Sequence, residues 1–454
     1  MNKIYSSKIH SAAKIPTMSH IFPFMLAVSL LVFMSATVFV SLSSLLKNSS
    51  SGGSIVPPNG EGENIITEHI KEVRGIYIAT VYNINYPSKQ GLSEEKLRLE
   101  LDDIVNTCAN ANLNTVYFQV RPSADALYKS DIFPVSEYIS GTQGDALPGD
   151  FDPLKYLIDA AHEKGISVHA WVNPLRVTVG SAAAPKHDVM ILAENHPARK
   201  NPRYTVPYAD GRLYFDCGIP EVRELIAMGV AEIAANYEVD GIIFDDYFYP
   251  YPVYCEDGTL AKFDDSRSYA VYGGNQPIDD WRRDNVNQMI KSCYDAIKSV
   301  NKGCEFGVAP FGIWQNDNGK NGGSATRGLE SYSAIYCDPT AWIKGEYIDY
   351  IAPQLYWRFT TPAAPYDVLL NWWSNIVDDT GVDLIISHGV YNYDTWDSPE
   401  NELREQVEFA RSEPSYRGSI LYGYDALKNN SNGLFDETRE VFSENIVYTS
   451  ALPN

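Results

Sequence analysis

Short apolar runs rich in β-branched and aromatic residues alternate with amphipathic segments along most of this 454-residue chain. The runs span residues 75–79, 115–120, 167–172, 241–244, 306–309, 350–354, 384–387 and 419–421. Alternating strands and helices imply parallel strand pairing, and eight such units predict closure into a (β/α)8 or TIM barrel of the α/β class. An open doubly wound sheet is the alternative fold, but no Gly-x-Gly-x-x-Gly motif follows the first run.

The segments between these runs have the periodicity of helices that bury one face. Helices are predicted over residues 95–111, 153–164, 220–237, 281–301, 366–378 and 398–413. Two longer segments, 177–213 and 251–280, are predicted to be loops. Because long loops that follow barrel strands usually build the active-site face, we expect both loops to lie there.

The run at residues 241–244 ends in two adjacent carboxylates, Asp245 and Asp246, followed by the aromatic residues of 247–249. The run is short, β-branched and preceded by Asp240-Gly241, which indicates a buried strand. Adjacent strand residues point to opposite faces, so the two acids cannot both enter an apolar interior. At the end of a barrel strand they can diverge into a cleft, which predicts a pair of catalytic acids.

Polar and aromatic side chains also lie at or just after the ends of the other predicted strands. The candidates for substrate binding are Arg121, His169, Trp171, Asn173, Gln354, Tyr356 and Trp357. Sugars present apolar ring faces for aromatic stacking and hydroxyls for hydrogen bonding. The sequence therefore predicts a carbohydrate site, although structural packing is the alternative for each of these residues taken alone.

The N-terminal region indicates export. Residues 1–14 carry three lysines and no acid, and residues 15–46 contain no Asp, Glu, Lys or Arg. This pattern predicts a membrane anchor with the rest of the chain outside the cytoplasm, and a cleaved signal peptide is the alternative. We predict a cytoplasmic tail and membrane or signal segment over residues 1–47, a flexible linker over 48–67 and the barrel over 68–454.

Composition restricts the partners of the chain. The formal charge of −22 disfavours binding to nucleic acid, which is held chiefly by cationic contacts to phosphate. None of the six cysteines forms a Cys-x-x-Cys pair, so we expect most of them to be buried, with one disulfide possible after export. No ligand spacing predicts a metal site, and no cofactor is expected.

Several of these segments resemble a known family. The matching stretches are VRGIY (73–77), NTVYFQVRP (114–122), DALY (125–128), HAWVNP (169–174), DGIIFDDYFYP (240–250), WRRDNVN (281–287) and PQLYW (353–357). In this order they resemble the glycosyl-hydrolase-10-like barrel family of exported bacterial proteins. The resemblance extends from about residue 70 to about residue 400 and implies a TIM barrel that hydrolyses glycosidic bonds. Members of this family are implicated in cleavage of bacterial cell-wall glycan.

Two mechanisms fit the acids in the sequence. Asp245 and Asp246 resemble the paired acids of substrate-assisted N-acetylhexosaminidases, in which the 2-acetamido oxygen of the sugar attacks its own anomeric carbon. By this analogy Asp245 orients the acetamido group, Asp246 is the general acid and base, and Tyr356 holds the acetamido carbonyl; the roles of the two acids can also be exchanged.

The alternative is a direct displacement with Asp246 as the acid and a second carboxylate from another loop. Two opposed carboxyls of that kind lie about 5 to 5.5 Å or about 6.5 to 9.5 Å apart. The candidates for the second carboxylate are Asp425, Asp216 and Asp125.

The expected function is that of an exported, membrane-tethered glycoside hydrolase that cleaves an N-acetylhexosamine-containing glycan, with peptidoglycan strands as the first candidate substrate. Host mucin-type glycans are the second candidate. The alternative from a different class is a noncatalytic glycan-binding protein of the cell envelope that keeps the barrel and its aromatic residues.

Overall fold

The computed structural model describes residues 67–451 except 398 and 400. The predicted membrane segment and nearly all of the predicted linker lie outside these residues. The first described strand, β1 (Thr67–Lys71), begins close to the expected start of the barrel. Within the described part of the chain, no helix is both long enough and apolar enough to cross a membrane.

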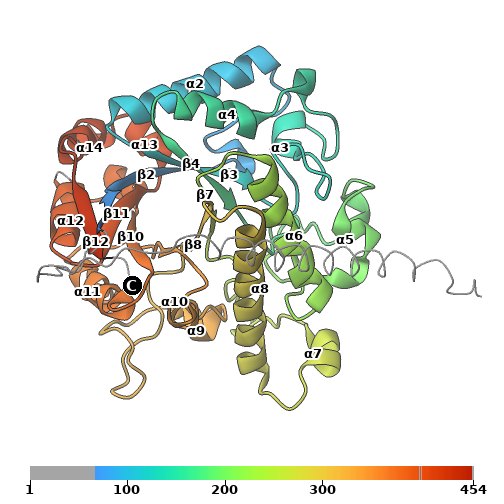
Figure 1. Ribbon diagram of the computed structural model, residues 1–454. Helices are drawn as coiled ribbons and strands as arrows, with labels where there is room; N and C mark the ends of the chain where they lie inside the picture. Colours follow the sequence, from blue (N-terminus) through green and yellow to red (C-terminus); the bar gives the residue numbers. More distant parts are fainter. Residues whose placement is uncertain (1–66, 398, 400, 452–454) are drawn as a thin grey trace, which may run out of the picture. The chain divides into compact units, whose positions relative to one another are not determined.

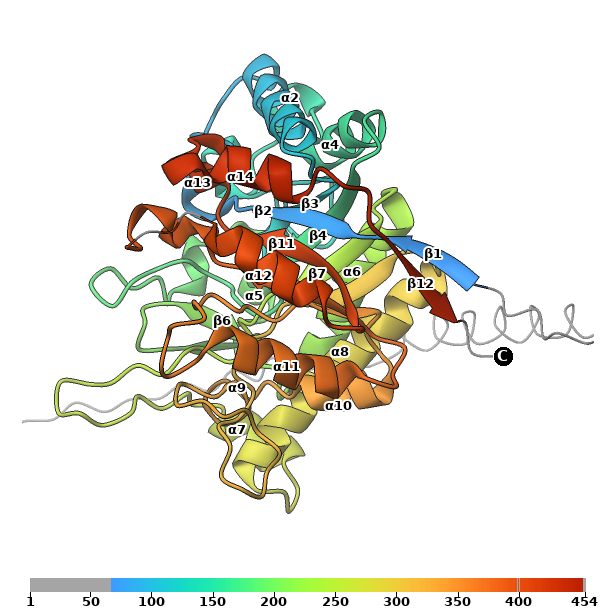
Figure 2. The same ribbon diagram turned by 90° about the vertical axis from the view of Figure 1, so that its left-hand side faces the viewer.

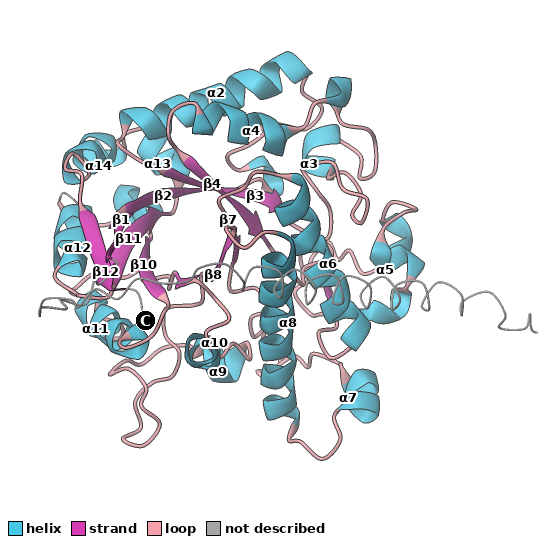
Figure 3. Cartoon of the chain, in the orientation of Figure 1, coloured by secondary structure: helices cyan, strands magenta, loops and turns pink. Residues whose placement is uncertain are grey.

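Eight parallel strands form a closed barrel, which confirms the predicted fold (Figures 1 and 3). In spatial order they are β2 (Val73–Ile78), β3 (Thr115–Arg121), β4 (Ser167–Val172), β7 (Gly241–Phe244), β8 (Glu305–Val308), β9 (Tyr350–Ile351), β10 (Asp383–His388) and β11 (Tyr416–Leu421). The barrel closes where β11 pairs with β2, with Ile420 opposite Gly75. Spatial order follows chain order, as expected for repeated right-handed βαβ units.

Helices surround the barrel (Figure 3). The main ones are α2 (Glu94–Asn110), α4 (Pro153–His162), α6 (Pro220–Asn236), α8 (Ile278–Val300), α10 (Pro339–Gly345), α11 (Tyr366–Val377), α12 (Glu402–Arg411) and α14 (Leu434–Val441). Helix α4 shows why they form where they do: Asp152 caps the first turn by accepting from the Lys155 amide, and Pro153 occupies the first helical position. The hydrophobic faces of these helices pack on the outside of the strands and form the main core of the protein.

Large aromatic rings fill the barrel interior. Tyr77, Tyr117, Trp171 and Tyr350 belong to one buried cluster inside the ring of strands. Glycine makes room for them, because a Cβ on Gly75 would lie 2.5 Å from the Tyr117 ring. The interior is therefore a packed core, and it opens into a cavity at the C-terminal ends of the strands.

Elements also occur in segments that had been predicted as loops. The segment 177–213 contributes α5 (Pro197–Lys200) and β5 (Thr205–Pro207), and β5 pairs with β6 (Leu213–Phe215). The segment 251–280 contains α7 (Ser266–Tyr272). These elements have three to seven residues, too few to show a clear hydrophobic period in the sequence.

Two further details were not anticipated. Strand β1 pairs antiparallel with β12 (Val447–Ala451), and this pair projects from the end at which β2 begins (Figure 2). Strand β9 stops at Ile351 and does not reach Gln354, because Pro353 has no amide hydrogen to donate to a ladder.

The cysteines are buried, as expected, except Cys255. All six are free thiols in the structure.

Candidate active site

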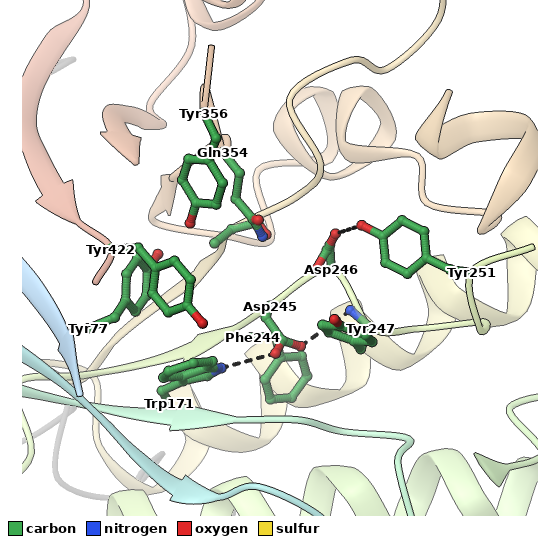
Figure 4. Close-up of a pocket in the computed structure, with 11 residues that line it drawn as sticks. Tyr77, Trp171, Phe244, Asp245, Asp246, Tyr247, Tyr251, Gln354, Tyr356 and Tyr422 are labelled. Atoms are coloured by element: carbon green, nitrogen blue, oxygen red, sulfur yellow. Dashed lines mark hydrogen bonds between the residues drawn. The ribbon is translucent and has the colours of Figure 1, made fainter. Parts of the chain in front are cut away.

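A cavity of about 240 Å³ lies at the C-terminal ends of the barrel strands (Figure 4). It is lined by Tyr77, Trp171, Phe244, Asp245, Asp246, Tyr247, Tyr251, Ala309, Gln354, Tyr356 and Tyr422. This volume is below the ~300–1,000 Å³ of pockets for drug-sized ligands, so it suits about one sugar ring. The two carboxylates in the lining are Asp245 and Asp246, and aromatic rings form most of the walls.

Asp245 accepts hydrogen bonds on both of its carboxylate oxygens. The Trp171 indole donates to Oδ2 over 3.2 Å, the Asn173 amide also donates to Oδ2, and the Tyr247 backbone amide donates to Oδ1 over 3.3 Å. Figure 4 shows the Trp171 ring below the carboxylate. All three groups are donors only in these contacts, so these hydrogen bonds by themselves favour the charged carboxylate.

Asp246 has a different environment. Its Oδ2 accepts a hydrogen bond from the Tyr251 hydroxyl, on the side of the cavity away from Trp171 (Figure 4). Gln354 is its second hydrogen-bonding neighbour, and the same side chain donates to the Ala309 carbonyl oxygen over 2.9 Å. A hydroxyl can donate or accept, so the contact with Tyr251 is compatible with either protonation state of Asp246.

Both acids face one cavity because strand β7 ends at Phe244, so strict alternation of side chains stops there. Burial and the nearby Asp246 charge raise the pKa of Asp245 to about 7. Burial also raises the pKa of Asp246, although hydrogen bonds from Tyr251 and Gln354 oppose the shift. Two buried carboxyls this close retain a proton near neutral pH, as general acid catalysis requires.

A buried network positions Asp245. The Asn173 side-chain oxygen accepts from Gln119 Nε2 over 2.6 Å and from Arg176 Nη2 over 3.0 Å. Arg176 also donates to the Pro122 carbonyl oxygen, and its guanidinium lies 5.2 Å from the centre of the Tyr247 ring. With its oxygen occupied in this way, the Asn173 amide nitrogen is directed at Asp245.

Aromatic rings line another wall of the cavity. The Tyr356 ring stacks on Tyr422 with centroids 5.9 Å apart and planes 11° apart, and Tyr77 packs edge-on against Trp171 at 5.3 Å. Burial raises the pKa of the Tyr356 hydroxyl well above its usual value, so it stays protonated and can donate to a ligand.

Trp171, Gln354 and Tyr356 therefore lie in the cavity, and Asn173 lies directly behind it. These are four of the seven residues that the sequence indicated for substrate binding.

The structure places Arg121 elsewhere. The register of β3 against β4 shifts between Gln119 and Arg121, so Gln119 pairs with Trp171 and Arg121 pairs with Val172. This bulge turns Arg121 out of the barrel, where its guanidinium lies 4.2 Å from the centre of the Phe133 ring. Without the extra residue, strand alternation would have directed the side chain inward.

His169 and Trp357 are also outside the cavity lining. His169 lies near the other end of the barrel, where Nδ1 is 2.9 Å from the Tyr350 hydroxyl and Nε2 is 3.8 Å from Glu305. Burial lowers the pKa of His169 to about 4, so it is neutral at physiological pH. Trp357 packs edge-on against Phe311 with centroids 5.6 Å apart.

The structure does not bring the three candidate second carboxylates to the cavity. Asp125 is buried beside Gln143, which donates to it over 3.4 Å. Asp216 is buried and accepts from the Gly218 amide over 2.9 Å. Asp425 is exposed on α13 (Tyr424–Lys428). Long loops hold the first two acids outside the barrel mouth, so no opposed carboxylate faces Asp246 among the described residues that line the cavity.

Several residues of the site had been given no role from the sequence: Tyr77, Gln119, Arg176, Tyr247, Tyr251 and Tyr422. Tyr77 and Tyr422 lie at or near strand ends, which is a usable signal. Arg176 and Tyr251 lie in long loops, where no hydrophobic periodicity in the sequence indicates which way a side chain points. In the described part of the chain, no cluster of three or more His, Cys, Asp or Glu residues could hold a metal ion.

Comparison with known proteins gives the family. The family model described as Glycosyl hydrolase-like 10 matches residues 72–402. The chain belongs to this family. It is 39% identical over 374 residues to glycosyl hydrolase YngK of Bacillus subtilis (strain 168), which covers 81% of this chain and 71% of that protein. It is 34% identical over 413 residues to glycosyl hydrolase DigH of Escherichia coli (strain K12), which covers 86% of this chain and 92% of that protein. This glycosyl hydrolase-like 10 protein is therefore a glycoside hydrolase.

Among solved structures, the chain is similar to the PgaB (BpsB) glycoside hydrolase domain from Bordetella bronchiseptica. The TM-score is 0.51 at 13% sequence identity, and the match covers 82% of this chain and 99% of that one. At this identity the similarity concerns the barrel fold alone.

Proposed function

We propose that this protein hydrolyses N-acetylhexosaminide bonds in a glycan strand by substrate-assisted catalysis at Asp245 and Asp246. The observation that carries the proposal is the difference between the hydrogen-bond partners of the two acids. Asp245 is surrounded by donors, whereas Asp246 contacts a hydroxyl that accommodates a proton on either oxygen.

The chemistry follows from these surroundings. Asp245 accepts a hydrogen bond from the acetamido N–H, which directs the acetamido oxygen at the anomeric carbon. As the new C–O bond forms, the glycosidic bond breaks and Asp246 gives its proton to the leaving oxygen. Water then attacks the anomeric carbon and transfers a proton to Asp246, the bond to the acetamido oxygen breaks, and the anomeric configuration is retained. Tyr356, which stays protonated, donates to the acetamido oxygen.

Substrate binding also decides which of the two acids, Asp245 or Asp246, carries the proton. In the free protein the buried pair retains a proton, and the pKa of Asp245 is about 7. The acetamido N–H stabilises the charged form of Asp245, because a hydrogen bond donated to a carboxylate lowers its pKa. The resulting charge on Asp245 raises the pKa of Asp246, which then holds the proton as the acid.

The first candidate substrate is the peptidoglycan strand, which consists of N-acetylated sugars. The N-terminal segment predicted to export and tether the chain supports this choice, because the barrel would then face the cell wall. Other N-acetylhexosamine-containing glycans, such as host mucin-type glycans, fit the same cavity chemistry and are second candidates.

The test is product analysis by mass spectrometry after incubation of the full-length protein with peptide-free glycan strands and with de-N-acetylated strands. We expect cleavage of the acetylated strands only, and a loss of at least about 100-fold in Asp246→Asn and in Asp245→Asn. The exposed acid Asp425 provides the matched control, and Asp425→Asn should keep wild-type activity. Cleavage of de-N-acetylated strands by the wild type would rule out assistance by the substrate.

A further inference from the structure

Tyr82 is an exposed aromatic residue at the face where the barrel strands end. It lies in the single turn η1 (Val81–Asn83), just after β2, and 58% of its surface is exposed. Its backbone has φ 55°, in the left-handed region, and the next residue, Asn83, has φ 53°. Bulky L residues rarely adopt this conformation, and strained residues of this kind cluster at functional sites.

Contacts with three neighbouring segments fix the position of Tyr82. The Asn83 side chain donates to the carbonyl oxygens of Pro87 and Tyr138, over 2.9 and 2.8 Å. The Tyr82 ring packs edge-on against the Tyr138 ring with centroids 6.4 Å apart. Arg212 is the third neighbour of Tyr82. Burial lowers the pKa of Arg212, but Tyr214, Asp210 and, least of all, a hydrogen bond to Tyr82 outweigh this effect and raise it. The Tyr82 ring is thus held in place without a ligand.

Hydrogen bonds join the turn of Tyr82 to the proposed catalytic acids. Gln119 Oε1 accepts from the backbone amides of Thr80 and Val81 over 2.8 and 2.9 Å, and Gln119 Nε2 donates to Asn173. Asn173 in turn donates to Asp245. Two side-chain amides, those of Gln119 and Asn173, therefore link the turn to Asp245.

We propose that Tyr82 is a stacking platform for a second sugar ring, next to the ring held in the cavity on the side of Asp245. The cavity of about 240 Å³ takes about one ring, so the neighbouring hexopyranose of a strand has to lie outside it. An exposed, pre-positioned aromatic face suits the apolar face of a pyranose and costs little side-chain entropy on binding. The ligand is a strand of at least two sugars, and the identity of those sugars rests on the proposed function.

The kinetic test compares glycan strands with a single-sugar aryl N-acetylhexosaminide. In Tyr82→Ala of the full-length protein, we expect the ratio of kcat/KM for strands to kcat/KM for the aryl glycoside to fall about 3- to 10-fold, mainly through KM. Tyr82→Phe should keep the wild-type ratio, because it retains the ring. Glycine adopts the left-handed backbone without strain, so Tyr82→Gly removes the ring without straining the turn. It should lower the ratio as much as Tyr82→Ala does. An unchanged ratio in Tyr82→Ala and Tyr82→Gly would overturn the proposal.

The matched control is Tyr272, which is 45% exposed and ends α7, far from β2 in both views (Figures 1 and 2). Tyr272→Ala should leave the ratio at the wild-type value. If Tyr272→Ala lowered the ratio as much as Tyr82→Ala, the effect would reflect general loss of exposed aromatics and the proposal would fail.

A binding measurement separates this inference from the proposed function. Calorimetric titration of chitin-derived tetrasaccharide into Asp246→Asn and into the double variant Asp246→Asn/Tyr82→Ala needs no turnover. About 3- to 10-fold weaker binding in the double variant supports the platform even if no strand is cleaved. Equal binding by the two variants overturns it, even if the proposed hydrolysis is correct.

Discussion

At the scale of single residues, Asn173 decides how Asp245 is presented. Its oxygen accepts from Gln119 and Arg176, and its nitrogen donates to Asp245. Residues that hydrogen-bond to a catalytic group or a metal ligand hold it in a narrow range of positions and orientations. Around metal sites, mutation of such residues typically costs about 10- to 100-fold in affinity or activity. Asn173 is therefore a positioning residue.

We predict that Asn173→Ala lowers kcat/KM about 10- to 100-fold and moves its acid limb to higher pH. The shift has this sign because the lost hydrogen bond stabilised the charged form of Asp245, so the pKa of Asp245 rises without it. The measurement is the pH profile of kcat/KM. Asn375, exposed on α11, is the control, and Asn375→Ala should leave both quantities unchanged. A rate loss with an unshifted acid limb would contradict this role.

At the scale of elements, a buried ion pair ties the end of α12 to the start of the barrel. Arg411 Nε and Nη2 donate to the two oxygens of Glu72, over 2.7 and 2.9 Å, and Glu72 is 1% exposed. Glu72 lies between β1 and β2, so the pair joins the last part of the barrel to the first. Loss of one partner leaves a buried charge without compensation.

We predict that Arg411→Met lowers the free energy of unfolding by about 3 kcal/mol, since breaking a buried pair typically costs ~3–5 kcal/mol. Urea denaturation provides the measurement. The control is the exposed pair of Lys291 and Asp295, 58% and 60% exposed, where Lys291→Met should change stability by less than about 1 kcal/mol. Similar losses in the two variants would show that burial of Glu72 does not matter.

At the scale of the whole molecule, the active site reduces stability at high pH. Asp245 has a pKa of about 7 in the folded protein, above the ordinary value of 3.8. The folded state therefore binds more protons than the unfolded state between these values, so stability falls as pH rises through this window and stays low above pH 7.

We predict that replacing Asp245 by Asn stabilises the protein more at pH 8 than at pH 4. The stability difference between Asp245→Asn and the wild type should grow by on the order of 4 kcal/mol between these two pH values. Denaturation by urea at both pH values measures this. Asp425→Asn serves as the control, because this acid is exposed. If the difference in free energy of unfolding between Asp245→Asn and the wild type is the same at pH 4 and at pH 8, the pKa of Asp245 is not raised in the folded protein.

The sequence predicted much of the architecture because local signals carry it. Strands β4 and β7 were predicted with the residue bounds that the structure gives, since a β-branched run between turn residues is a local pattern. The short pairs β5–β6 and β1–β12 were not predicted. Strands β5 and β6 have three residues each, too few to show a hydrophobic period, and β1 pairs with β12 from the opposite end of the described chain.

The candidate site was predictable where a residue follows directly from the end of a strand. Asp245, Asp246, Trp171 and Tyr356 lie in the cavity as expected. Arg121 does not, because one extra residue in β3 changes the face to which it points, and register against a neighbouring strand is not visible in a single sequence.

Hydrophobic periodicity and chain order suffice to predict the order of strands and helices, hence the barrel, and the two acids at the end of one strand. Which groups surround each acid depends on the folded barrel. It brought Asn173 and Trp171 to Asp245 and Tyr251 to Asp246, and it kept Asp125 and Asp216 out of the cavity. The physical reason is that burial, hydrogen-bond direction and pKa depend on contacts between distant segments, which exist only once the barrel has closed.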